Sequence, residues 1–193
     1  MNWEAEHWRI RCIGHIINLV VQAFLFTGVI KLEELESYDE QDESGVFRDE
    51  EAMRKQFRLL GPLGQAHNIV VYIRGSAGRT EEFRTLAGRL IPMDNRTRWN
   101  SWFNMLVVLL NLRPVVEKYC QDHEDELEDD ILTPKDWKML RMIKDFLAPF
   151  SRATLFTEGD SSSLDSTLFT MDVLIRHLQE ETVSPLFSLV QSS

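Results

Sequence analysis

The sequence lacks the features that place a protein in a membrane or outside the cell. Its 193 residues include only 2 cysteines, too few for a disulfide framework. No apolar run reaches the ~18–20 residues of a membrane span, because the longest, Ile16 to Ile30, is interrupted by Asn18 and Gln22. The same run lies too far along the chain for a signal peptide. These absences favour an intracellular protein.

Several catalytic signatures are missing too. The sequence has no Gly-rich phosphate loop, no Gly-x-Ser-x-Gly elbow and no His-Glu-x-x-His motif. With 21 basic and 31 acidic residues its net charge is −10, so nothing attracts it globally to nucleic acid or an anionic membrane. Such binding requires a local basic patch. Arg74 to Arg98 is a candidate, with six arginines against three acids.

Hydrophobic periodicity predicts a mainly α protein of about seven helices with one short N-terminal strand. His7 to Cys12 alternates polar and apolar residues, which is typical of a strand, and apolar residues then recur at helical spacing from Ile13 to about Ile30. Further helices are predicted over 48–74 (broken at Gly61-Pro62), 80–90, 101–119 (kinked or split at Arg113-Pro114) and 134–150, and Ser161 to Ser163 leads into a last helix that ends at about Glu181. Asn100 and Thr133 are the expected N-caps, and Ala148-Pro149 is expected to end the helix that contains it.

Acidic residues concentrate in two segments. Glu33 to Glu51 contains ten acids and one base, and Asp122 to Asp130 contains seven acids. We interpret Glu36 to Gly45 within the first segment, and the whole second segment, as solvated loops. The first segment divides the chain into three parts. They are a strand and helix over residues 1–30, an acidic loop over 31–47, and a helical region over 48–193.

Two Cys-x2-His pairs have a spacing that is found in zinc sites. Cys12 with His15, and Cys120 with His123, could together complete a tetrahedral Cys2His2 set. In the alternative interpretation, Cys12 packs as a small apolar residue and His15 hydrogen-bonds nearby backbone. The short spacing alone is a weak signal, and we predict no metal site.

The stretch from Asp94 to Trp102 gathers two arginines, two tryptophans and several amides around one predicted helix start. Arginines pair with phosphates, and an indole face can stack on an unpaired base. In the alternative, Trp99 and Trp102 lie on one helical face, because they are three residues apart, and simply pack in the core. Composition alone favours packing.

Five stretches resemble, in order, blocks of the hAT superfamily of DNA transposases (Ac/Restless-like). Arg11–Leu19 resembles its Cys-x2-His-x2-Asn-Leu signature, and Thr97–Ser101 resembles its Thr-Arg-Trp-Asn-Ser block. Leu147–Thr154 and Leu174–Leu178 resemble the two blocks that follow, and Gly61–Val70 resembles fungal-type members. The resemblance covers nearly the whole chain. It implies a partial RNase H-like core followed by part of an all-helical insertion domain.

The resemblance also implies a chemistry, which this chain does not carry. Full-length members cleave DNA with two Asp and one Glu that bind divalent metal, Mg²⁺, and those positions fall outside this chain. We therefore predict a truncated, catalytically inactive protein with no cofactor of its own. By resemblance, Arg96, Arg98 and Trp99 contact DNA, with Trp99 at the position that stabilises a flipped-out base. Cys12, His15 and Asn18 form a family motif to which we assign a structural role.

The expected partners follow from the same resemblance. They are DNA, bound weakly, and related transposase subunits, with the nucleus as the location; no membrane and no small-molecule substrate is expected. The alternative function is a retained helical interaction module that binds a protein partner or binds DNA weakly.

Overall fold

The computed structural model describes residues 13–26, 50–94, 98–157 and 164–182. These residues form nine α-helices and one short 3₁₀ helix, and no β-strand is found among them. The mainly α class is confirmed, and the number of helices exceeds the predicted seven. The strand predicted at His7 to Cys12 and the acidic loop over 31–47 lie outside the described residues.

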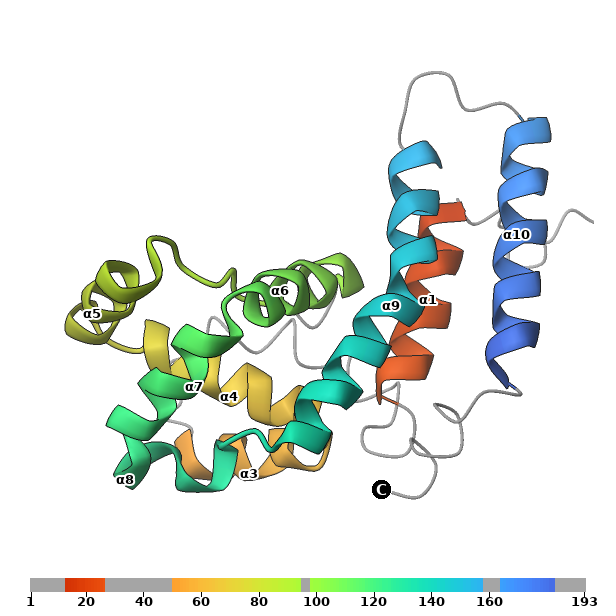
Figure 1. Ribbon diagram of the computed structural model, residues 1–193. Coiled ribbons are helices and arrows are strands. Elements are labelled where there is room, and N and C mark those ends of the chain that lie inside the picture. Colours follow the sequence, from red (N-terminus) through yellow and green to blue (C-terminus); the bar gives the residue numbers. More distant parts are fainter. Residues whose placement is uncertain (1–12, 27–49, 95–97, 158–163, 183–193) are drawn as a thin grey trace, which may run out of the picture.

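The helices follow one another along the chain as labelled in Figure 1. Their bounds are α1 (Ile13–Phe26), α3 (Glu50–Arg58), α4 (Pro62–Arg74), α5 (Ala77–Ala87), α6 (Trp99–Asn111), α7 (Arg113–Asp122), α8 (Glu124–Leu127), η1 (Glu128–Asp130), α9 (Pro134–Thr157) and α10 (Leu164–Thr182). Gly61-Pro62 separates α3 from α4, and Arg113-Pro114 splits the predicted helix 101–119 into α6 and α7. Proline removes a backbone donor and clashes with the preceding turn, which explains both breaks.

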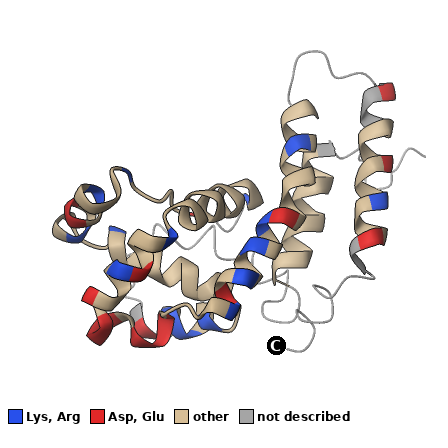
Figure 2. Cartoon of the chain, viewed as in Figure 1, with Lys and Arg blue, Asp and Glu red and all other residues tan. Residues whose placement is uncertain are grey.

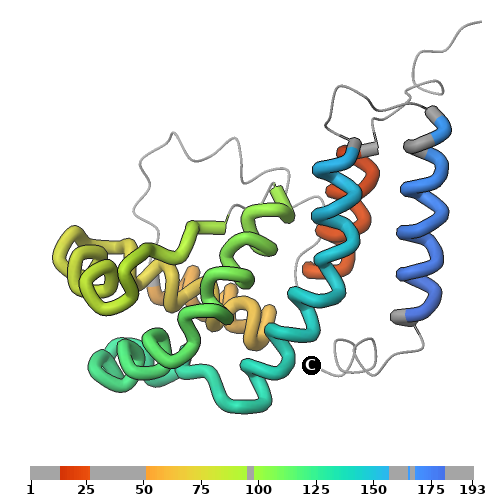
Figure 3. Tube along the Cα trace, turned by 45° about the horizontal axis from the view of Figure 1, so that its top comes forward, coloured from red at the N-terminus to blue at the C-terminus, as the bar shows by residue number. Residues whose placement is uncertain are grey.

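Helix α9 passes through the middle of the molecule and holds its two parts together. It contacts α4 and α6 on one side of the fold and α1 and α10 on the other. Figures 1 and 3 show α1, α9 and α10 side by side, while α3 to α8 form a second group around the start of α9. None of the helices that the structure describes is long and apolar enough to cross a membrane.

One continuous hydrophobic core runs through both groups of helices. Trp102 lies at its centre and is fully buried. Its ring meets Phe26 of α1 edge-on at 5.6 Å between centroids, and lies 5.6 Å from the ring of His67 of α4. Burying large aromatic side chains contributes strongly to stability. Trp102 therefore ties α1, α4 and α6 into one unit.

Helix α9 starts where the sequence predicts but ends later. Thr133 Oγ1 accepts a hydrogen bond from the backbone N–H of Asp136, and the Asp136 carboxylate accepts one from the N–H of Thr133. This reciprocal cap fixes the start at Pro134. The helix continues through Pro149 to Thr157, so the prediction that Ala148-Pro149 ends it is wrong. Phe146, Leu147 and Phe150 are buried on both sides of the proline, and their packing outweighs the ~3 kcal/mol that a proline costs inside a helix.

The second acidic segment is helical where a loop was predicted, and one of its seven acids is buried while the other six are exposed. Residues 124–130 form α8 and η1, and the side chains of Leu127 and Asp130 within them are fully buried. Leu127 anchors the segment to the core. Asp130 is held by residues from α3 and α4, more than sixty positions earlier in the chain, which a local charge count cannot reveal.

Candidate nucleic-acid interface

The start of α6 carries the predicted DNA-binding block. Trp99, its first residue, is 2% exposed. Its ring meets Phe150 of α9 edge-on, with 6.5 Å between centroids, and lies 6.4 Å from the ring of Phe103. An indole in this position cannot stack on a DNA base without leaving the core. The packing interpretation of Trp99 and Trp102 therefore agrees with the structure.

Asn18 of α1 caps the start of α6 from another helix. The Oδ1 atom of Asn18 accepts a hydrogen bond from the backbone N–H of Trp99 at 3.4 Å. The first N–H groups of a helix have no partner within that helix, and Arg98, at the N-cap position, accepts no hydrogen bond with its side chain. Asn18 therefore takes the place of the predicted cap Asn100, which lies inside the helix.

We expect Asn18→Ala to lower the free energy of unfolding by about 1 kcal/mol, the usual loss when a helix loses its cap. Asn18→Asp is the matched control, because it keeps a side-chain oxygen and places negative charge near the helix N-terminus. Urea unfolding followed by circular dichroism measures both variants. Equal losses for Ala and Asp would contradict a capping role.

Of the two described members of the predicted DNA-binding set, Arg98 is the exposed one. It lies at the N-cap position of α6, and its carbonyl oxygen accepts a hydrogen bond from Ser101 Oγ at 2.6 Å. Its guanidinium is free to meet an anion at the helix N-terminus, where negative charge is favoured. Arg96 lies outside the described residues, as does Cys12, while His15 is exposed on α1.

A histidine that the sequence analysis did not single out joins the same block to α4. His67 Nδ1 lies 2.8 and 2.9 Å from the two carboxylate oxygens of Asp94. Its ring is stacked on Phe57, with centroids 3.6 Å apart, and on Trp102. A ring that contacts two aromatic side chains and is bonded to a buried carboxylate packs with little freedom. His67 thus fixes the approach of α4 to the segment before α6.

The remaining motif blocks also meet inside the fold. His177 of α10 donates from Nε2 to the carbonyl oxygen of Phe146 at 2.9 Å, and its ring lies 5.7 Å from that of Phe150. Phe150 belongs to the block that follows the Arg-Trp block in the sequence, and it contacts Trp99. Residues that resemble family motifs therefore join α1, α4, α6, α9 and α10. These contacts are those of residues that stabilise the fold.

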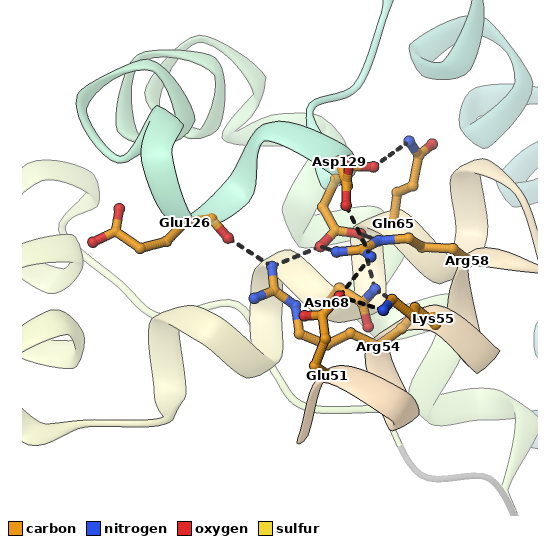
Figure 4. A network of polar contacts seen from close by, with 9 residues as sticks. Glu51, Arg54, Lys55, Arg58, Gln65, Asn68, Glu126 and Asp129 are labelled. Carbon is orange, nitrogen blue, oxygen red and sulfur yellow. Dashed lines mark hydrogen bonds and ion pairs between the residues drawn. The ribbon is translucent and has the colours of Figure 1, made fainter. Parts of the chain in front are cut away.

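A network of charged side chains fastens the acidic segment to α3 and α4 (Figure 4). The buried carboxylate of Asp130 accepts hydrogen bonds from Arg54 Nη2 at 2.7 Å, from Arg58 Nε and Nη2 at 2.9 Å each, and from Asn68 Nδ2 at 2.8 Å. Arg54 also donates to the carbonyl oxygen of Glu126 at 3.0 Å. The network gives a buried charge the partners that it requires.

Two opposing effects set the pKa of Asp130. Burial alone raises the pKa of a carboxyl group, because it disfavours the charged form. Hydrogen bonds from Arg58, Asn68 and Arg54 outweigh burial and hold the pKa of Asp130 below its ordinary value. The hydrogen bond to Asp130 in turn raises the pKa of the Arg58 guanidinium. Both groups therefore stay charged at neutral pH.

Two signals in the sequence could have indicated this network. Arg54 and Arg58 are four residues apart, so they lie on one face of α3. An apolar residue, Leu127, interrupts the acidic run shortly before Asp130. Together they suggest that part of the acidic segment is buried against a basic helix.

The described residues do not assemble a metal site. No group of three or more His, Cys, Asp or Glu side chains is close enough to hold a metal ion within these ranges. Cys120 is buried in α7, and burial raises the pKa of its thiol to about 12. His123 faces Glu82 at 3.2 Å and the hydroxyl of Tyr72 at 3.3 Å. Cys12 of the zinc alternative lies outside the described part of the chain.

Comparisons with known proteins identify a relative of this chain and its family. The "Putative transcriptional regulator tpeD" of Talaromyces stipitatus is 26% identical over 176 residues, which are 89% of this chain and 20% of that protein. The chain therefore spans about a fifth of the length of this curated relative. No solved structure matches the chain. Residues 10–146, well over half of the sequence, match the family model described as the ZBED1 RNase-like helical domain. The chain belongs to the ZBED1 RNase-like helical domain family.

Proposed function

We propose that this chain is a helical module derived from an hAT-type DNA transposase, and that it binds DNA weakly in the nucleus without cleaving it. The order of the five motif blocks supports the hAT origin. The family is described as a helical domain, and a relative carries the name of a putative regulator of transcription rather than that of an enzyme. In this proposal residues 1–30 belong to an RNase H-like core and 48–193 to the helical insertion.

The proposal of DNA binding rests on which of the described basic residues are paired with acids and which are not. Arg54 and Arg58 form ion pairs with the buried carboxylate of Asp130, and six other basic residues form ion pairs with neighbouring acids. The basic residues without a carboxylate partner among the described residues are instead exposed or partly exposed: Arg74, Arg79, Arg89, Arg98, Lys135, Lys138, Arg141 and Arg152. Exposed, uncompensated cations are what a phosphate backbone attracts.

The exposed side chains determine how the chain would bind DNA. Trp99 is buried, so base stacking has no exposed tryptophan in this block. Contacts would then come from Arg98 and other exposed bases to phosphate oxygens, which position DNA without reading its sequence. Such contacts release counterions and weaken steeply as salt rises.

We expect the chain to bind a fluorescent hairpin DNA at 50 mM salt and to lose affinity by about 40- to 150-fold at 200 mM, as three or four phosphate contacts predict. Anisotropy titrations at the two salt concentrations measure this loss, and the intact hairpin in the presence of Mg²⁺ tests the absence of cleavage. Tight binding that survives 200 mM salt would show that phosphate contacts do not dominate.

A protein-binding module is the second candidate, and one surface favours it. Leu168, Phe169 and Ile175 of α10 are 57%, 69% and 50% exposed, and Leu155 and Phe156 at the end of α9 are 69% and 57% exposed. Exposed apolar clusters of this kind mark interaction sites, and related transposase subunits are the partners that the resemblance suggests. The DNA titration separates the two candidates, since a module that binds protein alone leaves the hairpin free at low salt.

A further inference from the structure

We infer that DNA lies along the outer side of α9, where its phosphates meet Lys138, Arg141 and Arg152, which we call the α9 basic face. The inference rests on the proposed function and names the surface that carries it. The motif resemblance places the main DNA contact at the start of α6. The inference places it instead on α9, a helix to which the resemblance assigns no role in binding.

The three residues share one side of the helix. At ~100° per residue, Lys138, Arg141 and Arg152 fall within about 60° of one another. All three are exposed. The opposite side of α9 carries the buried residues Leu140, Phe146, Leu147 and Phe150, while the buried Trp137 borders the basic face. The basic face therefore looks away from the core, on a helix that the core holds in place.

The charge on this side of α9 is not cancelled within the described part of the chain. None of the three side chains makes a hydrogen bond or ion pair with a described residue, in contrast to the paired bases of α3 and α7. Asp145 lies on the same side but is bound by the ammonium group of Lys144. Figure 2 shows basic positions recurring along α9, whereas acidic positions crowd α8 and η1.

The dimensions of the face suit a nucleic-acid backbone. Lys138 and Arg152 are separated by about 21 Å along the helix axis, at ~1.5 Å per residue. That length spans about six base-pair steps of a duplex, whose strands each present one phosphate every ~3.4 Å. Because α9 is packed on α1, α4, α6 and α10, its basic residues are held on a rigid element before DNA arrives.

The composition of the face favours nucleic acid over an acidic protein. Between Lys138 and Arg152, the exposed positions of α9 are Arg141 and Asp145, and both are charged. A protein interface needs apolar or aromatic anchors at its centre, and this stretch exposes none. A phosphate backbone needs only repeated cations at suitable spacing.

The test is a hairpin-DNA anisotropy titration on the full chain and on the double variant Lys138→Gln/Arg141→Gln. We expect the variant to bind about tenfold more weakly at low salt, and the slope of log affinity against log salt to fall by about 2, close to 0.9 for each phosphate contact removed. The matched control is Lys55→Gln/Lys118→Gln. It removes the same charge from exposed lysines that already pair with Glu51 and Asp122, and it should leave affinity and slope unchanged.

Each other outcome overturns the inference in a recognisable way. Wild-type binding that is reduced by Arg98→Gln but not by the α9 double variant would return the contact to α6 and leave the proposed function intact. Equal losses for the double variant and the control pair would show that net charge, and not this face, sets affinity. Binding of polyglutamate but not of DNA would assign the face to an acidic protein. No DNA binding by the wild-type chain would reject the proposed function itself. Circular dichroism and thermal melting confirm that every variant is folded.

Discussion

Replacing Asp130 by alanine should lower the free energy of unfolding by about 3–5 kcal/mol, the usual loss when one partner of a buried ion pair is removed. The carboxylate is fully buried and accepts hydrogen bonds from Arg54, Arg58 and Asn68. Alanine would leave two guanidinium groups facing each other with no counterion between them, and would leave the amide of Asn68 without one of its acceptors. A loss of this size is a large part of the stability of an average domain.

Two controls separate charge from shape and position. Asp130→Asn keeps the size of the side chain but removes the charge and one acceptor, so we expect a loss nearly as large. Asp129→Ala removes a neighbouring acid whose side chain is 67% exposed and which contacts Arg58 at 3.1 Å, and exposed ion pairs contribute ~0–1 kcal/mol. Urea unfolding at pH 7 compares the three variants with the wild type. A loss for Asp129→Ala equal to that for Asp130→Ala would contradict the network as the source of stability.

The same residue gives the protein a pH dependence of defined sign. The pKa of Asp130 is lowered in the folded state, so its contribution to stability is fully present above the unfolded value of about 4 and is lost as pH falls through the lower folded pKa. The difference in unfolding free energy between wild type and Asp130→Ala should therefore be constant from pH 7 to about 5. It should narrow at more acid pH.

Local sequence patterns were sufficient for the helices and insufficient for the contacts between them. The apolar periods of α1, α4 and α9 located those helices, and Pro134 after Thr133 gave the start of α9, because caps and periodicity depend on neighbours in the chain. The seven acids before Ile131 look solvated by the same local logic. Six of them are exposed, but Asp130 is buried. The burial of Asp130 depends on Arg54 and Arg58, which only the folded chain brings near, so a local count of charges does not reveal it.

The candidate site shows the same division. The sequence identified the Arg-Trp block but left two roles open for Trp99, packing in the core or stacking on a base. Only the folded structure shows that Trp99 is buried. Asn18 and Trp99 are far apart in the sequence, and their hydrogen bond at 3.4 Å follows from how α1 and α6 lie against α9. His67 lies within the Gly61–Val70 block, but its contact with Asp94 depends on the tertiary fold. The two tryptophans of the block are held in place by core contacts, and the described exposed cations other than Arg98 lie outside the block.

Trp99→Ala decides whether the indole packs or binds. We expect the free energy of unfolding to fall by about 3–5 kcal/mol, as for other large aromatic residues removed from a core. Trp99 is 2% exposed and its ring contacts Phe103 and Phe150. Trp99→Phe keeps an aromatic ring in the same space and should cost less than half as much. Chemical unfolding at low temperature, where the variants remain folded, measures both.

The binding side of the same experiment uses the fraction of the variant that is still folded. A packing residue, once removed, lowers stability and leaves the hairpin affinity of the folded fraction unchanged, because phosphate contacts come from other side chains. A stacking residue does the reverse, since loss of base stacking costs ~1–3 kcal/mol of binding per base and little stability. Unchanged unfolding together with abolished DNA binding would make the packing interpretation wrong. It would also imply that Trp99 leaves the core when DNA binds, which the contact between α6 and α9 would then have to permit.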